Sequence, residues 1–175
     1  MRSKLAVAGI ALALVCLAPS ARAQCRADVP QARLIGQGPF CFLGFCLYDA
    51  QLWAQRPPYA FDEPFALLLT YRRAIKADTL VDAGIREIRR LAQAPLPAAT
   101  LDAWRADMTR AFSDVAPGDR LCGVFIPGHG ARFYNNEALT AEINDTDFAV
   151  AFFRIWLDPD TRATRLRQSL LGESP

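Results

Sequence analysis

The first strongly apolar stretch after the N-terminal region has the pattern of a β-hairpin. Residues 34–53 are rich in aromatic and aliphatic side chains and are interrupted at Leu43 and Gly44. This pattern predicts two strands joined by a tight turn. A further apolar run follows Pro64 and predicts a third strand over residues 65–71. The first third of the chain is therefore expected to form neighbouring antiparallel strands.

Two stretches with helical spacing follow these strands. Residues 77–93 place charged side chains opposite an apolar face, which consists of Leu80, Val81, Gly84, Ile88 and Leu91. We expect Asp78 to cap this helix near its start. A second helix is predicted over residues 100–112, with Leu101, Trp104, Met108 and Phe112 at helical spacing. Both apolar stripes are typical of helices that pack on a core.

The second half of the chain returns to strands and then to helices. Strands are predicted over residues 120–126, 131–134 and 138–143, separated by turn sequences rich in Gly, Pro and Asn. Asn144 or Asp145 is expected to cap a helix that runs through Leu157 and whose apolar content is too wide for a surface helix. A last helix is predicted over residues 161–171. This order of elements predicts an α+β domain with helices over one face of an antiparallel sheet.

The first 23 residues have the three parts of a secretory signal peptide. Arg2 and Lys4 precede an apolar run over residues 5–18, and Ala21 to Ala23 form an A-x-A cleavage site. The run is shorter than the roughly 20 residues that a membrane-spanning helix needs. We expect cleavage after Ala23, a single domain over residues 24–175, and a periplasmic or secreted location. An uncleaved N-terminal anchor is the alternative.

Cleavage would also change the charge balance. It would remove Arg2, Lys4 and Arg22 and no acidic residue, so that 17 of the 20 Lys and Arg residues would remain against 18 Asp and Glu. A nearly neutral domain lacks the basic field that nucleic acids require. We therefore expect no nucleic-acid partner and no stable membrane span, and the sequence identifies no protein partner.

Four cysteines remain after the leader: Cys25, Cys41, Cys46 and Cys122. An even number in an exported chain favours two disulfides, with three possible pairings. A turn at Leu43 and Gly44 would place Cys41 opposite Cys46, which favours that pair and leaves Cys25 with Cys122. Zinc binding is the rival interpretation, but no C-x-x-C pair is present and the single histidine, His129, lies in a Pro-Gly-His-Gly turn. We expect no metal and no other cofactor.

An ordered set of segments resembles the exported chalcone isomerase-like proteins of bacteria. The segments are Gly36-Gln37-Gly38, the hairpin ending Phe45 to Trp53, Leu80-Val81-Asp82, Asp114 to Leu121, and Asp147-Phe148-Ala149 leading to Ile155-Trp156-Leu157. The resemblance covers about residues 34–172. It implies an open-faced β-sandwich with a cleft between a large antiparallel sheet and a helical layer. Plant members of the family close a chalcone to a flavanone in this cleft, whereas other members bind fatty acids.

The residues that serve catalysis in the family do not carry over. Pro39 and Phe40 stand where the resemblance implies an arginine, and Tyr48 stands in place of a threonine. Lys76 falls near the expected tyrosine, and Ala83 near the expected asparagine. The guanidinium that would hold a phenolate or carboxylate bidentately has no obvious replacement.

Candidate ligand contacts follow from the strand period. Tyr48, Ala50 and Leu52 share one strand face, which the resemblance turns toward the cleft. Lys76 is a candidate cation for an anionic ligand at the cleft mouth, and a buried structural tyrosine and a solvated lysine are the alternatives. His129 has no neighbour in sequence to orient it for catalysis, and no G-x-S-x-G motif is present.

These observations favour a non-catalytic exported domain that binds a small apolar or amphipathic molecule, such as a fatty acid, between sheet and helices. The first alternative is an isomerase or intramolecular lyase acting on a chalcone-like substrate, with Tyr48 and Lys76 replacing the usual groups. The second is a structural protein of the envelope.

Overall fold

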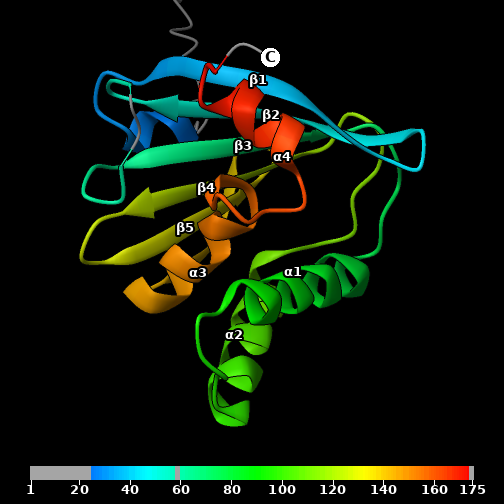
Figure 1. Ribbon diagram of the computed structural model, residues 1–175, viewed down its shortest axis with the longest axis vertical. Coiled ribbons are helices and arrows are strands. Elements are labelled where there is room, and N and C mark those ends of the chain that lie inside the picture. The colour runs from blue at the N-terminus through cyan, green and yellow to red at the C-terminus, as the bar shows by residue number, and fades with distance from the viewer. Residues whose placement is uncertain (1–24, 58–59, 174–175) are drawn as a thin grey trace, which may run out of the picture.

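The computed structural model describes residues 25–57 and 60–173, so the predicted leader lies outside the described residues. Its centre is a six-stranded sheet in the order β1-β2-β3-β4-β5-β6, with every neighbouring pair antiparallel (Figure 1). The strands are β1 (Arg33–Phe42), β2 (Phe45–Ala54), β3 (Phe65–Tyr71), β4 (Arg120–Ile126), β5 (Gly130–Asn135) and β6 (Ala138–Ile143). All six predicted strands are present, and Leu43 and Gly44 form the predicted turn.

Helices cover one side of this sheet (Figure 1). Two of them, α1 (Ala77–Leu91) and α2 (Ala98–Ala111), lie between β3 and β4 in the chain. The other two, α3 (Thr146–Leu157) and α4 (Thr164–Leu170), follow β6. The predicted α+β class and the open-faced β-sandwich are both confirmed. No helix within the described ranges is both long and apolar enough to cross a membrane.

A short antiparallel β-bridge joins the two ends of the helical segment between β3 and β4. The backbone N–H of Ile75 donates to the carbonyl of Val115 at 3.0 Å, and the N–H of Val115 donates back to Ile75 at 3.0 Å. Ile75 precedes α1 and Val115 follows α2. The two ends of the segment that contains α1 and α2 are thus fixed next to each other, which holds both helices against the sheet.

The start of α1 corrects one sequence prediction. Asp78 lies inside the first turn, whereas the residue at the N-cap position is Lys76, whose side chain makes no capping bond. A carboxylate oxygen of Asp114 instead accepts a hydrogen bond from the N–H of Ala77 at 3.0 Å. A free backbone N–H group in the first turn of α1 is therefore bonded by a residue that follows α2. The spacing of residues in the sequence does not reveal this contact.

The last helix is shorter than predicted. It begins at Thr164 because the segment before it makes its own hydrogen bonds. The buried hydroxyl of Thr161 donates to the carbonyl of Ile155 at 2.6 Å and accepts from the N–H of Ala163 at 3.1 Å. These local bonds satisfy the backbone without a helical turn. The cap of α3 agrees with expectation, since the Asp145 side chain accepts from the N–H of Phe148.

The main core lies between the sheet and the helices and is rich in aromatic rings. Phe65 of β3, Phe125 of β4 and Phe153 of α3 are almost fully buried and contact one another at ring-centroid distances of 5.0 to 6.0 Å. Burial of rings of this size is the main stabilising contribution of such a layer. The predicted burial of α3 is confirmed, because Phe148, Phe152, Phe153 and Trp156 all face this core.

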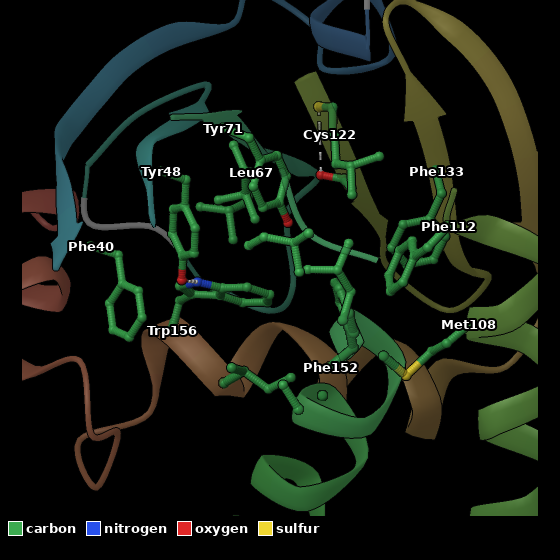
Figure 2. Close-up of a pocket in the computed structure, with 18 of the residues that line it drawn as sticks. Phe40, Tyr48, Leu67, Tyr71, Met108, Phe112, Cys122, Phe133, Phe152 and Trp156 are labelled. Atoms are coloured by element: carbon green, nitrogen blue, oxygen red, sulfur yellow. Dashed lines mark hydrogen bonds between the residues drawn. The ribbon is translucent and has the colours of Figure 1, made fainter. Parts of the chain in front are cut away.

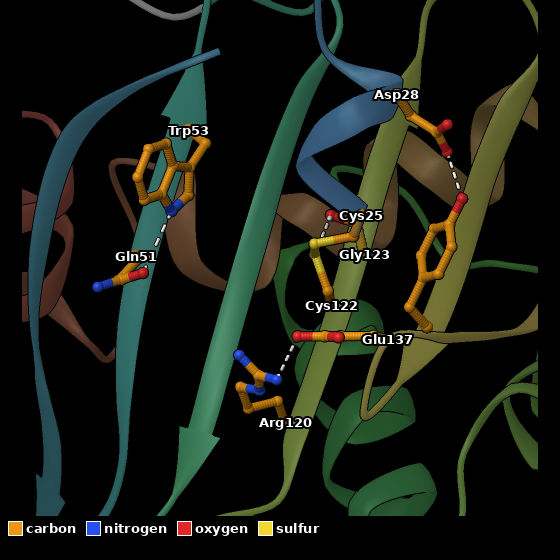
Figure 3. The surroundings of a disulfide bond; sticks show 9 residues. Cys25, Asp28, Gln51, Trp53, Arg120, Cys122, Gly123 and Glu137 are labelled. Carbon is orange, nitrogen blue, oxygen red and sulfur yellow. Dashed lines mark hydrogen bonds and ion pairs between the residues drawn. A yellow bond between two sulfur atoms is a disulfide. The ribbon is translucent and has the colours of Figure 1, made fainter. Parts of the chain in front are cut away.

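The opposite face of the sheet has a small cluster of its own. A single 3₁₀ turn, η1 (Cys25–Asp28), lies against β4, and a disulfide joins Cys25 to Cys122 of that strand (Figure 3). The hydroxyl of Tyr134 donates to the carboxylate of Asp28 on the same face. This disulfide ties the start of the described chain to the middle of the sheet across a sequence separation of 97 residues.

The second disulfide joins Cys41 to Cys46 across the β1–β2 hairpin. Both favoured pairings are therefore formed in the structure. The tip beyond this disulfide is apolar and exposed, with 62% of Phe42, 80% of Leu43 and 58% of Phe45 accessible. The guanidinium of Arg73 lies over the ring of Phe45 at 4.9 Å.

Glycine at position 36 has a packing role. A Cβ atom there would lie 2.0 Å from the carbonyl oxygen of Ser169 at the end of α4. Only a residue without a side chain allows the backbones of β1 and α4 to come this close. The pair of glycines in β1 therefore serves the docking of the last helix.

Candidate functional site

A cavity of about 240 Å³ lies between the sheet and the helical layer (Figure 2). Strands β1 to β5 form one wall, and α1, α3 and the end of α2 form the other. The side chains that line it include Phe40, Leu47, Tyr48, Leu67, Leu69, Tyr71, Ile75, Leu80, Ala83, Met108, Phe112, Phe133, Phe152, Ile155 and Trp156. Concave sites of this composition bind apolar small molecules.

The charged groups of the wall are few. Among the described residues that line the cavity, Glu87 is the one with a carboxyl or basic side chain. Its carboxylate is held by Arg90 at 2.8 Å and by Arg162 at 3.0 Å, neither of which lines the cavity. Thr79 adds an exposed hydroxyl-bearing residue to the wall. The interior is thus bounded mainly by hydrocarbon and aromatic surface.

Tyr48 of β2 carries one of the polar atoms inside the cavity. Its hydroxyl accepts a hydrogen bond from Nε1 of Trp156 at 2.9 Å, drawn as a dashed line in Figure 2. Its ring stacks on Phe40 of β1 at a centroid distance of 5.1 Å. Burial raises the pKa of the Tyr48 phenol, and the hydrogen bond from Trp156 only partly offsets this effect. Tyr48 is therefore a neutral phenol at physiological pH.

Tyr71 of β3 carries a second phenol next to the first. It is the direct cross-strand partner of Tyr48, and the two rings lie 5.6 Å apart. The residue is 4% exposed, and its hydroxyl makes no hydrogen bond to any described residue. Burial raises the pKa of Tyr71, and the neighbouring Tyr48 raises it further. Figure 2 shows this side chain directed toward the space between sheet and helices.

The predicted ligand contacts occupy different environments. Tyr48 lines the cavity, whereas Ala50 and Leu52, on the same strand face, are fully buried in the core and are not part of the wall. Lys76 lies outside the cavity with most of its side chain in solvent, and its Nζ pairs with Asp114 at 2.6 Å. This pair lowers the pKa of Asp114 and raises the pKa of Lys76. The structure therefore does not bring Lys76 together with Tyr48.

The positions that differ from the catalytic pattern of the resembling enzymes are informative. Phe40, Tyr48 and Ala83 all line the cavity, at the places where an arginine, a threonine and an asparagine were expected. Aromatic and methyl groups therefore occupy the space that a guanidinium and an amide would fill. Pro39 is exposed on β1.

His129 lies away from the cavity. It is exposed in the turn between β4 and β5, and its Nε2 is 2.8 Å from a carboxylate oxygen of Glu142. This contact, together with Arg132, lowers the pKa of Glu142. Within residues 25–57 and 60–173, no group of three or more His, Cys, Asp or Glu side chains is placed to hold a metal ion.

Sequence reasoning missed Tyr71 and Trp156 as members of the site. The two-residue period of β3 puts Tyr71 on the same face as Leu69 and Leu67. Pairing β3 with β2 would have placed this face in the predicted site next to Tyr48. Trp156 was placed in a buried helix, but its contact with Tyr48, at a sequence separation of 108 residues, carries no local signal.

Sequence and structure comparisons relate the chain to known proteins. An uncharacterized protein of Haemophilus influenzae is 28% identical over 141 residues, which cover 80% of this chain and 68% of that protein. A solved structure of an Arabidopsis thaliana fatty-acid binding protein superposes with a TM-score of 0.64, covering 81% of this chain and 87% of the other, at 9% identity. Residues 47–172 match the family described as chalcone isomerase-like. The matched region contains most of the cavity wall, and the chain belongs to the chalcone isomerase-like family.

Proposed function

We propose that this protein binds a small apolar or amphipathic molecule, of the fatty-acid type in its hydrocarbon part, and does not convert it chemically. The observation that carries the proposal is the cavity of about 240 Å³ between sheet and helices, with its almost wholly apolar wall. A hydrocarbon chain that enters this space leaves water without requiring polar partners, which favours binding. The fatty-acid binding protein with the same fold supports this type of ligand.

The groups inside the cavity argue against the isomerase alternative. A catalyst that closes a chalcone must stabilise a phenolate, and no Lys or Arg is among the described residues that line the wall. Tyr48 and Tyr71 have raised pKa values and are poor proton acceptors near neutral pH. Lys76, the other group of that hypothesis, points to solvent and to Asp114. These features support binding without chemistry.

The test is to identify what the protein carries. The full chain is produced in a bacterial host, purified without detergent, and examined by native mass spectrometry, followed by solvent extraction and mass spectrometry of the released molecules. We expect a bound species with a hydrocarbon chain and, after its removal, a thermal stabilisation when apolar ligands are added. Protein that is empty as isolated and gains no stability from any apolar ligand would contradict the proposal. Incubation with chalcones should yield flavanone at the uncatalysed rate.

We also propose that the protein works in the periplasm or is secreted. The leader sequence over residues 1–23 and the two disulfides support this location, because disulfides persist in oxidising compartments. Fractionation of cells that express the full chain, with N-terminal sequencing of the product, provides the test. A product that begins at Gln24 outside the cytoplasm is expected, and an intact leader on cytoplasmic protein would contradict the proposal.

A further inference from the structure

We infer that the cavity selects ligands whose polar group is an uncharged hydrogen-bond acceptor, such as the carbonyl oxygen of a ketone, ester or amide, over ligands that carry a carboxylate. The inference rests on the proposed function, because it defines the polar end of the molecule that the same cavity binds. It follows from the hydrogen-bond donors in the wall and from the placement of the charges around it.

The two buried phenols of the wall are hydrogen-bond donors. A phenol has one hydrogen to donate. The Tyr48 oxygen accepts from Trp156 and donates to no described residue, so its hydrogen is available to a ligand. The Tyr71 hydroxyl has no hydrogen-bond partner among the described residues, although the residue is 4% exposed. Because Tyr71 lines the cavity, its hydroxyl can donate to a ligand there, and this hydrogen bond would contribute to the binding free energy.

The rings of the two phenols lie side by side. Tyr48 and Tyr71 are paired across β2 and β3, and their rings are 5.6 Å apart on the same face of the sheet. A carbonyl oxygen accepts hydrogen bonds, so either phenol can donate to it. Burial keeps both phenols protonated, since it raises the pKa of each. The pair therefore matches a neutral acceptor at the end of an apolar chain.

The charges around the cavity disfavour an anion. A carboxylate that leaves water for an apolar cavity needs a cation or several donors to offset its lost hydration. The described part of the wall contains no Lys or Arg, and its one carboxyl group, that of Glu87, cannot offset the negative charge of a ligand. Arg90 and Arg162 are already bonded to Glu87 and lie off the wall. Two phenols alone do not neutralise a bound anion.

The experiment compares ligands of one chain length and shape that differ in charge. Isothermal titration calorimetry of the delipidated protein at about pH 8, where a carboxylic acid is ionised, uses decanoate, its neutral isostere decanamide, and 2-undecanone. We expect decanamide and 2-undecanone to bind at least about tenfold more tightly than decanoate, because only the anion loses its hydration without a counter-charge. The ketone matters because it has no N–H group of its own to donate.

A pair of variants tests the donor. Tyr71→Phe should weaken the binding of decanamide and 2-undecanone by about fivefold, the worth of one hydrogen bond, and should leave the affinity for decanoate little changed. Tyr134→Phe is the matched control, because Tyr134 also borders the cavity but its hydroxyl donates to Asp28 on the other face of the sheet. It should leave all three affinities unchanged.

Each contrary outcome has a separate meaning. Decanoate that binds as tightly as decanamide, or more tightly, would overturn the inference and leave the proposed function in place. Unchanged affinities for the neutral ligands in Tyr71→Phe would overturn the assignment of Tyr71 as the donor. If none of the three compounds binds, the proposed function fails and the inference fails with it.

Discussion

Trp156 and Tyr48 fasten α3 to the sheet by a hydrogen bond inside the cavity, with Nε1 of the indole 2.9 Å from the phenol oxygen. Tyr48→Phe should remove the acceptor and leave the indole N–H without a protein partner. We expect a loss of about 1 to 3 kcal/mol in the free energy of unfolding, measured by urea denaturation. Tyr71→Phe is the matched control, because the Tyr71 hydroxyl bonds to no described residue, and its stability should change much less. Equal losses in the two variants would contradict a stabilising hydrogen bond between Trp156 and Tyr48.

The cavity should be blocked by a larger side chain on α1. Ala83 lines the cavity, so that Ala83→Phe places a ring in the space of the ligand. We expect the mass of the co-purified ligand to disappear in native mass spectrometry, while the far-ultraviolet circular dichroism stays the same. Ala106→Phe introduces the same ring at an exposed position on α2 and should keep the ligand. Retention of the ligand by Ala83→Phe would show that the molecule binds elsewhere.

The two disulfides should contribute unequally to stability. In the chain-entropy description, a bridge that closes a long loop restricts the unfolded chain more than one that closes a short loop. Cys25–Cys122 spans 97 residues and Cys41–Cys46 spans 5. Replacing both cysteines of the long bridge with alanine should cost up to about 5 kcal/mol, against up to about 2 kcal/mol for the short bridge. Denaturant titrations of the two double variants measure this difference, and a larger loss for the hairpin pair would contradict it.

Stability should fall at alkaline pH because buried phenols resist ionisation. Burial and the hydrogen bond to Asp28 raise the pKa of Tyr134 from 10.0 to about 12, and burial also raises the pKa of Tyr48 and Tyr71. Because the pKa of each phenol is higher in the folded state than in the unfolded state, there is a pH range in which the folded protein keeps the phenol proton and the unfolded chain has lost it. The stabilisation is therefore complete below about pH 10 and is lost as the pH rises toward 12 and beyond.

Urea titrations at about pH 8, 10 and 11 check this expectation, together with the absorbance of tyrosinate in the native protein. The unfolding midpoint should decrease above pH 10, and Tyr134→Phe should reduce the steepness of the decrease. A midpoint that is constant over this range would contradict the environments assigned to these phenols.

The approach of β1 to α4 should not tolerate a side chain at position 36. A Cβ atom in Gly36→Ala would collide with the carbonyl oxygen of Ser169, so one of the two backbones must shift. We expect a loss of about 1 to 3 kcal/mol in urea denaturation, the usual cost of overpacking. Gln37→Ala changes the neighbouring exposed residue of the same strand and should have little effect. Equal stability of both variants would show that α4 docks more loosely.

The strands and the hairpin could be predicted because their signals are local. The period of two residues and the turn at Leu43 and Gly44 fix the pairing of β1 with β2, and this pairing places Cys41 opposite Cys46. Helix ends were less predictable, because they depend on distant groups. Asp114 satisfies the start of α1, and the contacts of Thr161 delay the start of α4. Neither contact is visible in the spacing of apolar residues.

The site could be predicted only in part, because a strand face does not reveal where the helices leave a space. Tyr48, Ala50 and Leu52 share one face, yet only Tyr48 reaches the cavity, since the other two are covered by the core. Lys76 has the chemistry for an anionic ligand, but Asp114 holds it in solvent. Trp156 and Tyr71 join the site through tertiary contacts.

The bridge between Ile75 and Val115 separates two parts of the architecture that can change independently. The strands pair without the residues between these positions, because β3 and β4 bond directly to each other. The segment enclosed by the bridge supplies Leu80, Ala83 and Met108 to the cavity. Exchange of this segment between homologues, with Ile75 and Val115 kept, would therefore change the shape of the cavity while the sheet stays the same. Such exchanges offer a direct route to engineered specificity.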